Sequence, residues 1–414
     1  MNIKEKLALL KKTVDRVNQR HAVASPAVKN KTKPMEFPGF ITKETSAGPA
    51  YYRDTVFPVN HRHGNVFIRE AVDVPGIILC FLGQDPELES VCLKDAVFID
   101  TETTGLAGGT GTVAFLVGAG FFREGSFVVR QYFMPDYHQE APMLEHLKGL
   151  MDGHFSLVTF NGKTLDMPII NTRMIMNRLR CDRNELPHLD LLHPARRLWK
   201  ATYGSCNLTA LERQVLGFRR YDDIPGSEIP EIYFRYIRNR RFDMMEKVLE
   251  HNLHDIVSMA ALAVRMWEHV EMGQCFNLEE AGDYQSLGRI HQNRGEWMKA
   301  ASYYEKALKC PGGDNLDMVR RNLSLIYKKE KQWDRALDLW MEMDRKARVS
   351  IFASVELAKY YEHQVRDYPM ALRHSLRAMD MLKNRKKIAG AGNDHREFQE
   401  LSRRLDRLRK KLGS

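Results

Sequence analysis

The 414-residue sequence has no long apolar run, which argues against a membrane-spanning helix. Its longest apolar stretches, around Ile77–Leu82 and Val113–Phe122, fall far short of the roughly 20 residues that a spanning helix needs. The first residues, Met1 to Lys6, carry charges and are not followed by an apolar core with a small-residue cleavage site, so we expect no signal peptide. These absences predict a cytoplasmic protein with no membrane partner.

Paired cysteines are missing as well. The six cysteines are scattered, and no two have the close spacing of a zinc knuckle or a redox pair. In a reducing compartment, such residues act as small buried apolar side chains. We therefore expect neither a disulfide scaffold nor a structural zinc site.

Acidic residues are outnumbered by basic ones. The chain has 53 Asp and Glu against 63 Lys and Arg, a formal net charge of +10. A surplus of this size favours an anionic partner, either nucleic acid or a membrane surface. A basic protein without such a partner has the same composition, so the charge alone leaves the question open.

Changes of pattern along the chain predict two domains with a basic segment at each end. Residues 1–35 are basic and have apolar residues at helical spacing over Ile3–Gln19, which predicts an N-terminal helix and linker. Residues 36–268 are expected to form the first domain, with short strands and turns over residues 36–92 and alternating strands and helices over residues 93–268. Residues 276–382 carry a helical repeat. Residues 383–414 are basic with an apolar stripe, which predicts a C-terminal helix that caps the repeats.

The strand signals of the first domain predict a mixed sheet. Strands are expected over Ala96–Ile99, Thr112–Phe122 and Phe127–Phe133, the last two joined by a hairpin turn at residues 123–126. Two shorter strands, Ser156–Phe160 and His188–Leu192, alternate with helices, an order that is typical of parallel pairing. The helices are expected over Ala141–Met151, Met167–Arg180 and Met244–Glu268.

An internal repeat defines the second domain. Leu287, Leu323 and Leu357 are each followed by a small residue and occupy equivalent positions, 36 and 34 residues apart. The pattern resembles tetratricopeptide helix pairs, in which small residues allow close helix approach. The fold expected from these patterns is an α/β domain, with a mixed sheet flanked by helices, followed by an all-α repeat domain.

Two acids follow the first buried strand of the α/β domain. Asp100 and Glu102 are two residues apart in an extended segment, so their carboxylates face the same side. Two adjacent like charges are costly unless a cation neutralises them. Hard oxygen ligands of this kind suit Mg²⁺ or Mn²⁺.

Two further segments place acids at the ends of predicted elements. Asp166 follows a strand and the turn Asn161–Leu165, and it begins the next helix. His251 and Asp255 are four residues apart in a long helix and share one of its faces. His254, one residue before Asp255, is expected to point elsewhere.

Taken in order, these three segments resemble the exonuclease motifs of the DnaQ-like, DEDD superfamily, which has a ribonuclease-H-like fold. The resemblance is closest to the YprB-type branch, in which such a domain is joined to tetratricopeptide repeats, and it covers roughly residues 36–385. It implies that two divalent ions, Mg²⁺ or Mn²⁺, are held by four carboxylates. Carried over position by position, these ligands are Asp100, Glu102, Asp166 and Asp255.

The fifth catalytic position departs from the superfamily patterns. One branch has a histidine five places before the last aspartate, where this chain has Glu250, and another has a tyrosine four places before, where it has His251. His251 is therefore the expected fifth catalytic residue, which either orients or deprotonates the attacking water. Further candidates for substrate binding are Thr103, Gly105, Leu106, Asn161 and Lys163.

The resemblance implies a 3′-5′ exonuclease that acts by two-metal-ion phosphodiester hydrolysis. Single-stranded DNA in DNA repair is the preferred substrate, because the family tends to accompany helicases; a helicase or another protein is a candidate partner for the repeats. Two alternatives stay open: an RNA-processing exonuclease on the same fold, and a repeat scaffold that binds nucleic acid but barely cuts it.

Overall fold

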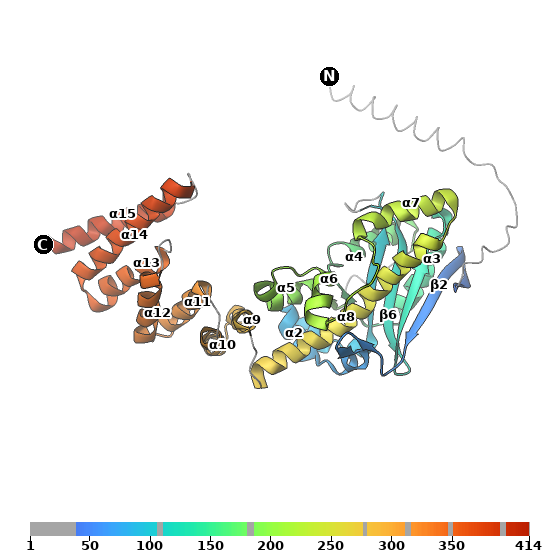
Figure 1. The fold of residues 1–414 in the computed structure, drawn as a ribbon, viewed down its shortest axis with the longest axis horizontal. Helices are drawn as coiled ribbons and strands as arrows, with labels where there is room; N and C mark the ends of the chain where they lie inside the picture. The colour runs from blue at the N-terminus through green and yellow to red at the C-terminus, as the bar shows by residue number, and fades with distance from the viewer. Residues whose placement is uncertain are drawn as a thin grey trace, which may run out of the picture. The chain divides into compact units, whose positions relative to one another are not determined.

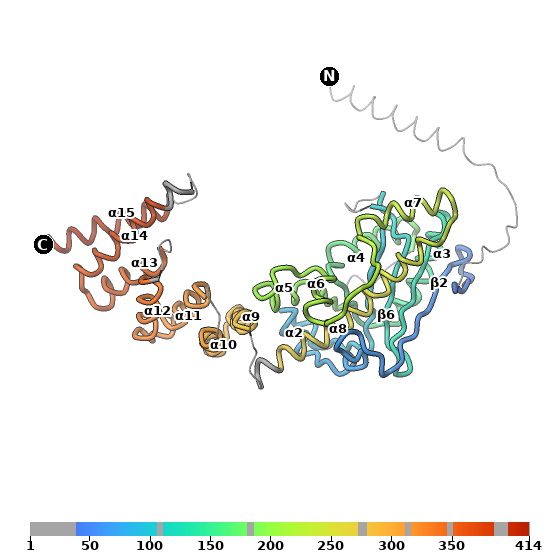
Figure 2. The backbone as a smooth tube through the Cα atoms, viewed as in Figure 1, coloured from blue at the N-terminus to red at the C-terminus, as the bar shows by residue number. Residues whose placement is uncertain are grey.

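The computed structural model describes residues 39–105, 111–179, 186–275, 280–310, 316–346, 351–389 and 395–413 (Figures 1 and 2). The N-terminal helix expected within residues 1–35 lies outside these residues, as does Leu106. In the described part of the chain, none of the helices combines the length and apolar character needed to cross a membrane.

A seven-stranded mixed sheet forms the centre of the first domain. Its strand order is β1-β2-β7-β6-β5-β8-β9, in which β5 pairs antiparallel with β6 and parallel with β8. The sequence-based prediction of a mixed sheet is therefore confirmed, and the observed strands lie close to the expected ranges. Their bounds are β1 Ile41–Thr45, β2 Gly48–Phe57, β5 Ala96–Thr103, β6 Ala114–Arg123, β7 Ser126–Phe133, β8 Ser156–Thr159 and β9 His188–Asp190.

Helices cover both faces of the sheet. On one face, His146 of α3 packs edge-on against Tyr132, with ring centroids 5.2 Å apart. On the other, Asn252 of α8 accepts a hydrogen bond from Gln131. Because adjacent strand residues point to opposite faces, α3 and α8 lie on opposite sides of the sheet. The helices of this domain are α2 Gly76–Gly83, α3 Glu140–Met151, α4 Asp166–Met176, α5 Leu192–Tyr203, α6 Leu208–Leu211, α7 Ile229–Asn239 and α8 Asp243–Cys275.

Two glycines of β6 let α8 approach the sheet closely. A Cβ atom at Gly118 would lie 2.4 Å from Oδ1 of Asn252, and one at Gly120 would lie 2.5 Å from Cγ2 of Ile256. Both distances are shorter than van der Waals contact, so any larger residue would push the helix or its side chains away. The absence of these two side chains therefore sets how near α8 lies to β5 and β6.

The segment before β5 is more regular than its sequence indicates. Besides the ten-residue β2, it contains the short hairpin of β3 (Arg62–His63) and β4 (Val66–Phe67), together with α2. The apolar run Ile77–Leu82 forms most of α2, and its Leu79 and Leu82 are buried. Tertiary burial, rather than a periodic pattern, explains this helix.

The second domain consists of helix pairs, as the repeat predicts. Leu287, Leu323 and Leu357 occupy the first helix of three successive pairs and are all buried. The small residue after Leu287 is required, because a Cβ atom at Gly288 would lie 2.7 Å from the ring of Tyr304. The helices are α9 Ala281–Asn293, α10 Trp297–Lys309, α11 Asp317–Lys329, α12 Trp333–Lys346, α13 Ile351–Tyr360 and α14 Tyr368–Ala389.

The last helix, α15 (His395–Leu412), packs against the end of the repeats. Its apolar stripe, Leu401, Leu405 and Leu408, is buried. The helix therefore caps the repeat stack, and its basic residues lie on the remaining faces. α14 extends to Ala389, past the boundary at residue 382 that the repeat pattern predicts.

Candidate active site

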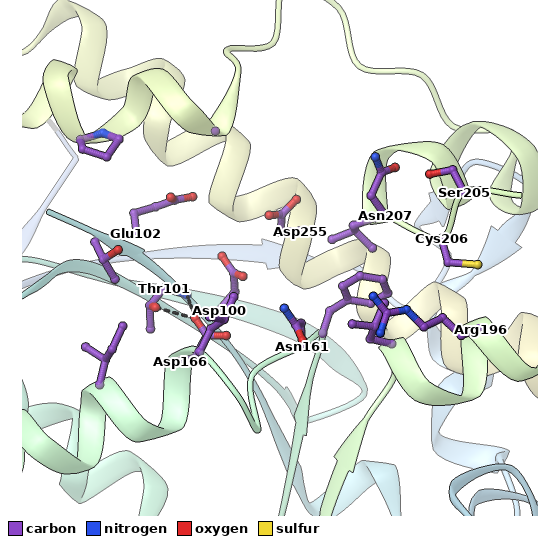
Figure 3. A pocket seen from close by; sticks show the side chains of 18 of the residues that line it. Asp100, Thr101, Glu102, Asn161, Asp166, Arg196, Ser205, Cys206, Asn207 and Asp255 are labelled. Carbon is purple, nitrogen blue, oxygen red and sulfur yellow. Dashed lines mark hydrogen bonds between the residues drawn. The ribbon is translucent and has the colours of Figure 1, made fainter. Parts of the chain in front are cut away.

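The acids singled out in the sequence come together in the folded chain. Asp100 and Glu102 lie on β5, Asp166 is the first residue of α4, and Asp255 lies within α8. All four line one cavity of about 590 Å³, where Figure 3 shows their carboxylates gathered on one side. Residues more than 150 positions apart in sequence thus form a single acidic site.

Asp166 is tied to the strand that carries the other acids. Its Oδ1 accepts hydrogen bonds from the backbone nitrogen of Thr101, at 3.0 Å, and from the hydroxyl of Thr101, at 2.5 Å. Because Thr101 points to the face opposite Asp100 and Glu102, this contact fixes the start of α4 at the edge of β5. The second oxygen of Asp166 is not used by Thr101 and is left for another ligand.

Burial and neighbouring charges raise the pKa of three of these carboxylates. Burial and the charges of Asp255 and Asp166 raise the pKa of Asp100 well above its usual range, against the lowering effect of a hydrogen bond from Asn252. Burial and the charge of Asp100 do the same for Glu102. Burial raises the pKa of Asp166 to about 6, although its bonds with Thr101 oppose the change. Ionised carboxylates that are buried this close together repel one another, and a bound multivalent cation would offset this repulsion.

Asp100 is held by a buried chain of amides. Asn252 donates from Nδ2 to Oδ2 of Asp100 at 2.8 Å, and its Oδ1 accepts from Gln131 at 3.0 Å. Asn252 and Gln131 are fully buried. Gly118 lies opposite Asp100 on β6 and provides the space in which Asn252 reaches the carboxylate. The role of Asn252 could not be predicted from the sequence, because it depends on a glycine far away in the chain.

His251 lies beside the acids, one turn before Asp255. Its Nε2 is 3.7 Å from Oδ2 of Asp255, and its Nδ1 is 2.8 Å from Oδ1 of Asp223. Glu102, His251 and Asp255 each offer a ligand atom within 4.8 Å of the other two. His254 instead packs its ring against Phe218, with centroids 5.1 Å apart. The structure thus brings His251, and not His254, to the site.

A buried arginine that the sequence analysis missed lies behind the site. Arg220 donates to Asp255 and to both oxygens of Glu212, at 2.5 and 2.7 Å. It also lies 3.4 Å from Asp223. Burial lowers the pKa of Arg220, but Asp255 and Glu212 outweigh this effect and raise it. No local pattern in residues 219–223 identifies this arginine, because its partners come from distant segments.

Of the five candidates for substrate binding, three line the cavity: Thr103, Gly105 and Asn161. Lys163 is not among the lining residues, and its backbone nitrogen donates to Asp190 at 3.1 Å. Asp190 is buried and also accepts from the backbone of Asn161 at 2.8 Å, so it shapes the loop after β8. Asn161 has the left-handed φ of +68°, which asparagine tolerates better than most residues.

The donor set fits a hard divalent cation. Carboxylate oxygens from three elements converge, burial and neighbouring charges raise the pKa of Asp100 and Glu102, and one histidine nitrogen lies within reach. Such acids cannot remain ionised together at low cost without a positive charge between them. The chemistry of the residues present is therefore that of a metal-dependent site.

Comparison with known families identifies the class. Residues 97–267 match the model of the RNase_H superfamily, and residues 284–317 match a tetratricopeptide repeat model. The first match spans the acids from Asp100 to Asp255, and the second spans α9 and α10. A ribonuclease-H-like domain with a cluster of acids suggests a nuclease, to which helical repeats are added.

The particular family follows from a relative in Bacillus subtilis (strain 168). The "Uncharacterized protein YprB" of that organism is 30% identical over 370 residues, which cover 87% of this chain and 86% of the relative. The chain belongs to the YprB family.

One solved structure that resembles the chain is the family B DNA polymerase from the hyperthermophilic archaeon Pyrobaculum calidifontis. The sequence identity is 11% and the TM-score is 0.33, over 57% of this chain. The matched part is 29% of the polymerase chain, and a likeness this weak carries no functional argument.

Proposed function

We propose that the protein is a metal-dependent 3′-5′ exonuclease that hydrolyses nucleic-acid phosphodiesters with two divalent ions, Mg²⁺ or Mn²⁺. The observation that supports this most is the meeting of four carboxylates in one cavity, with raised pKa values for three of them. A protein gains nothing in stability from such repulsion, so the cluster indicates a function. The type of reaction is inferred from the resemblance to the DEDD exonucleases.

The ligand roles follow from where each acid lies. Asp100 is central and would be shared by the two ions, Glu102 and Asp255 would hold the first, and Asp166 would hold the second. A pair of ions of this kind lowers the pKa of an attacking water and stabilises charge on the leaving 3′-oxygen. Asn252 and Thr101 keep their acids in place, at 2.8 Å from Asp100 and 3.0 Å from Asp166.

His251 is proposed as the general base. Its Nδ1 lies 2.8 Å from Oδ1 of Asp223 and 3.3 Å from Nη1 of Arg220, so the ring is held in position from this side. Its Nε2 lies 3.7 Å from Oδ2 of Asp255, where a neutral imidazole with that nitrogen unprotonated would take a proton from water.

Single-stranded DNA in a repair process is the proposed substrate, and this choice rests on the family resemblance. An RNA-processing exonuclease is the second candidate, since the site residues do not separate the two sugars; that distinction requires contacts at the 2′ position. A weakly catalytic scaffold is the third. The complete acid set favours catalysis, because a degenerate site would be expected to lose ligands.

The repeats are proposed to dock a partner protein, such as a helicase. Stacked helix pairs provide extended surfaces that suit peptide or protein binding. The acidic site would then carry out the chemistry, and the repeats would recruit the partner protein.

The direct test is digestion of 5′-labelled single-stranded DNA, duplex DNA and RNA with Mn²⁺, Mg²⁺ or EDTA. Asp100→Ala serves as the inactive variant. Glu250→Gln is the matched control, because Glu250 is exposed and stands at the histidine position of the other branch. We expect a ladder that shortens from the 3′ end, lost with EDTA and with Asp100→Ala but kept with Glu250→Gln.

Each other outcome has a distinct meaning. Preferential digestion of the RNA oligomer would indicate an RNA-processing exonuclease. Binding without cleavage in every metal would support the scaffold. Cleavage that survives Asp100→Ala would contradict the proposed ligand set.

A further inference from the structure

The cavity that holds the acids extends to the helix α5. Arg196 and Lys200 line it from α5, one helical turn apart, together with Ser205, Cys206 and Asn207 from the loop that follows. Figure 3 shows Arg196 extending into the cavity on the side away from Glu102. One end of the cavity is therefore acidic and the other carries positive charge.

Among the described residues, Arg196 has no protein partner, unlike Arg197 and Lys200. In the part of the chain that the structure describes, its side chain makes no hydrogen bond or ion pair, and it is exposed. Arg197, by contrast, donates to the carbonyl of Leu82 at 2.5 Å, and Lys200 donates to the carbonyl of Gly204. A guanidinium that faces a cavity without a partner is available to an anionic ligand.

Apolar side chains also line the cavity. Phe160, Leu165 and Leu208 line it, and 46% of Leu165 is exposed. An exposed leucine and an aromatic ring beside a polar site offer a surface on which a nucleobase can pack. The cavity volume of about 590 Å³ lies within the range of roughly 300–1,000 Å³ that is usual for ligand sites.

We propose that Arg196 binds a phosphate of the substrate strand adjacent to the scissile one, so that tight binding uses at least two phosphates. This inference rests on the proposed nuclease function and adds the contact that fixes the strand. The acids hold the scissile phosphate through metal, the apolar wall contacts a base, and Arg196 pairs with the next phosphate. Arginine suits this role because its planar donors match two phosphate oxygens.

Binding provides a test that does not depend on cleavage. Anisotropy of a 5′-fluorescein-labelled single-stranded DNA 12-mer is measured with Ca²⁺ over a range of salt for the wild type, Arg196→Ala, Arg196→Lys and Arg213→Ala. Arg213 is the matched control because it is exposed and does not line the cavity. We expect Arg196→Ala to weaken binding about 10-fold or more, with Arg213→Ala unchanged.

The salt dependence identifies the contact as a phosphate. Log K falls linearly as log[salt] rises, and loss of one phosphate contact to a single strand makes this slope shallower by about 0.7. Arg196→Ala is expected to show this decrease, and Arg196→Lys is expected to restore most of the slope because it keeps the charge. An unchanged affinity and slope for Arg196→Ala would overturn the proposal.

Substrate chemistry provides the complementary test. A neutral methylphosphonate is placed at one linkage at a time near the 3′ end. At one position it should weaken wild-type binding but cause no further loss in Arg196→Ala. The p-nitrophenyl ester of thymidine 5′-phosphate has only the scissile phosphate, so its turnover should be the same in both proteins. Equal penalties for wild type and Arg196→Ala at every linkage would refute the assignment.

The two proposals fail in different ways. Binding that depends on Arg196 without any cleavage would leave the phosphate site standing and remove the nuclease. Cleavage with no dependence on Arg196 would do the reverse. A wild type that neither binds nor cleaves any of these oligomers would overturn both.

Discussion

Replacing Asp166 by asparagine is expected to stabilise the metal-free protein and to do so more at neutral than at acidic pH. The side chain is 7% exposed and has a pKa of about 6 in the folded state, against an ordinary value of 3.8. Asparagine keeps an oxygen that can accept the hydrogen bonds from Thr101. It removes only the charge.

The sign follows from proton linkage. Because the folded state has the higher pKa, it keeps its proton between pH ~4 and ~6 while the unfolded chain has already released its own. The wild type therefore loses stability as the pH rises through this window, and the loss is complete above pH ~6. With these pKa values the cost of the Asp166 charge is about 1.5 kcal/mol at pH 5 and about 3 kcal/mol at pH 7.5.

Urea unfolding in EDTA at pH 5 and pH 7.5, followed by circular dichroism, measures this difference. The gain in the free energy of unfolding for Asp166→Asn should be roughly twice as large at pH 7.5. Asp73→Asn is the matched control, because Asp73 is exposed in the same domain. Mn²⁺ should stabilise the wild type more than Asp166→Asn. Destabilisation by Asp166→Asn, to the same extent at both pH values, would refute the view that its charge is strained.

Three other variants probe how the site is built. Asn252→Ala should lower activity or metal affinity about 10- to 100-fold while the protein still folds, because the hydrogen bond that orients Asp100 is lost; titration calorimetry with Mn²⁺ and initial rates measure both. Arg220→Met should destabilise the protein by about 3–5 kcal/mol in urea unfolding, because Glu212 is left buried without its partner; an unchanged midpoint would show that the arginine is not structural. His251→Gln should reduce kcat about 10²- to 10⁴-fold in initial-rate measurements, and an unchanged kcat would show that His251 is not the base.

The acids of the site were predictable because local geometry determines their positions. A buried strand followed by two acids at alternate positions puts Asp100 and Glu102 on one face, whatever the rest of the fold does. The spacing of His251 and Asp255 on a helix is equally local. These two pairs of residues are far apart in the sequence. The α/β order of the elements brings them together, because it places the ends of β5 and β8 beside one another.

The supporting residues could not be predicted in the same way. Arg220 lies in an irregular segment, and its contacts with Glu212 and Asp255 exist only after distant helices have packed. Arg196 reads in the sequence as an ordinary basic residue of an amphipathic helix. Arg196 stands out because it faces the cavity and has no partner among the described residues. Both properties appear only in the folded structure.

The closeness of α8 to the sheet has a consequence for how the family tolerates mutation. Gly118 and Gly120 bear no functional group, yet a single methyl group at either would collide with the helix that carries Asn252 and Asp255. A survey of tolerated substitutions should therefore find these two strand positions as restricted as the acids themselves. The position of the catalytic helix therefore depends on the lack of side chains at these two glycines, and only a substitution that adds volume there would test this.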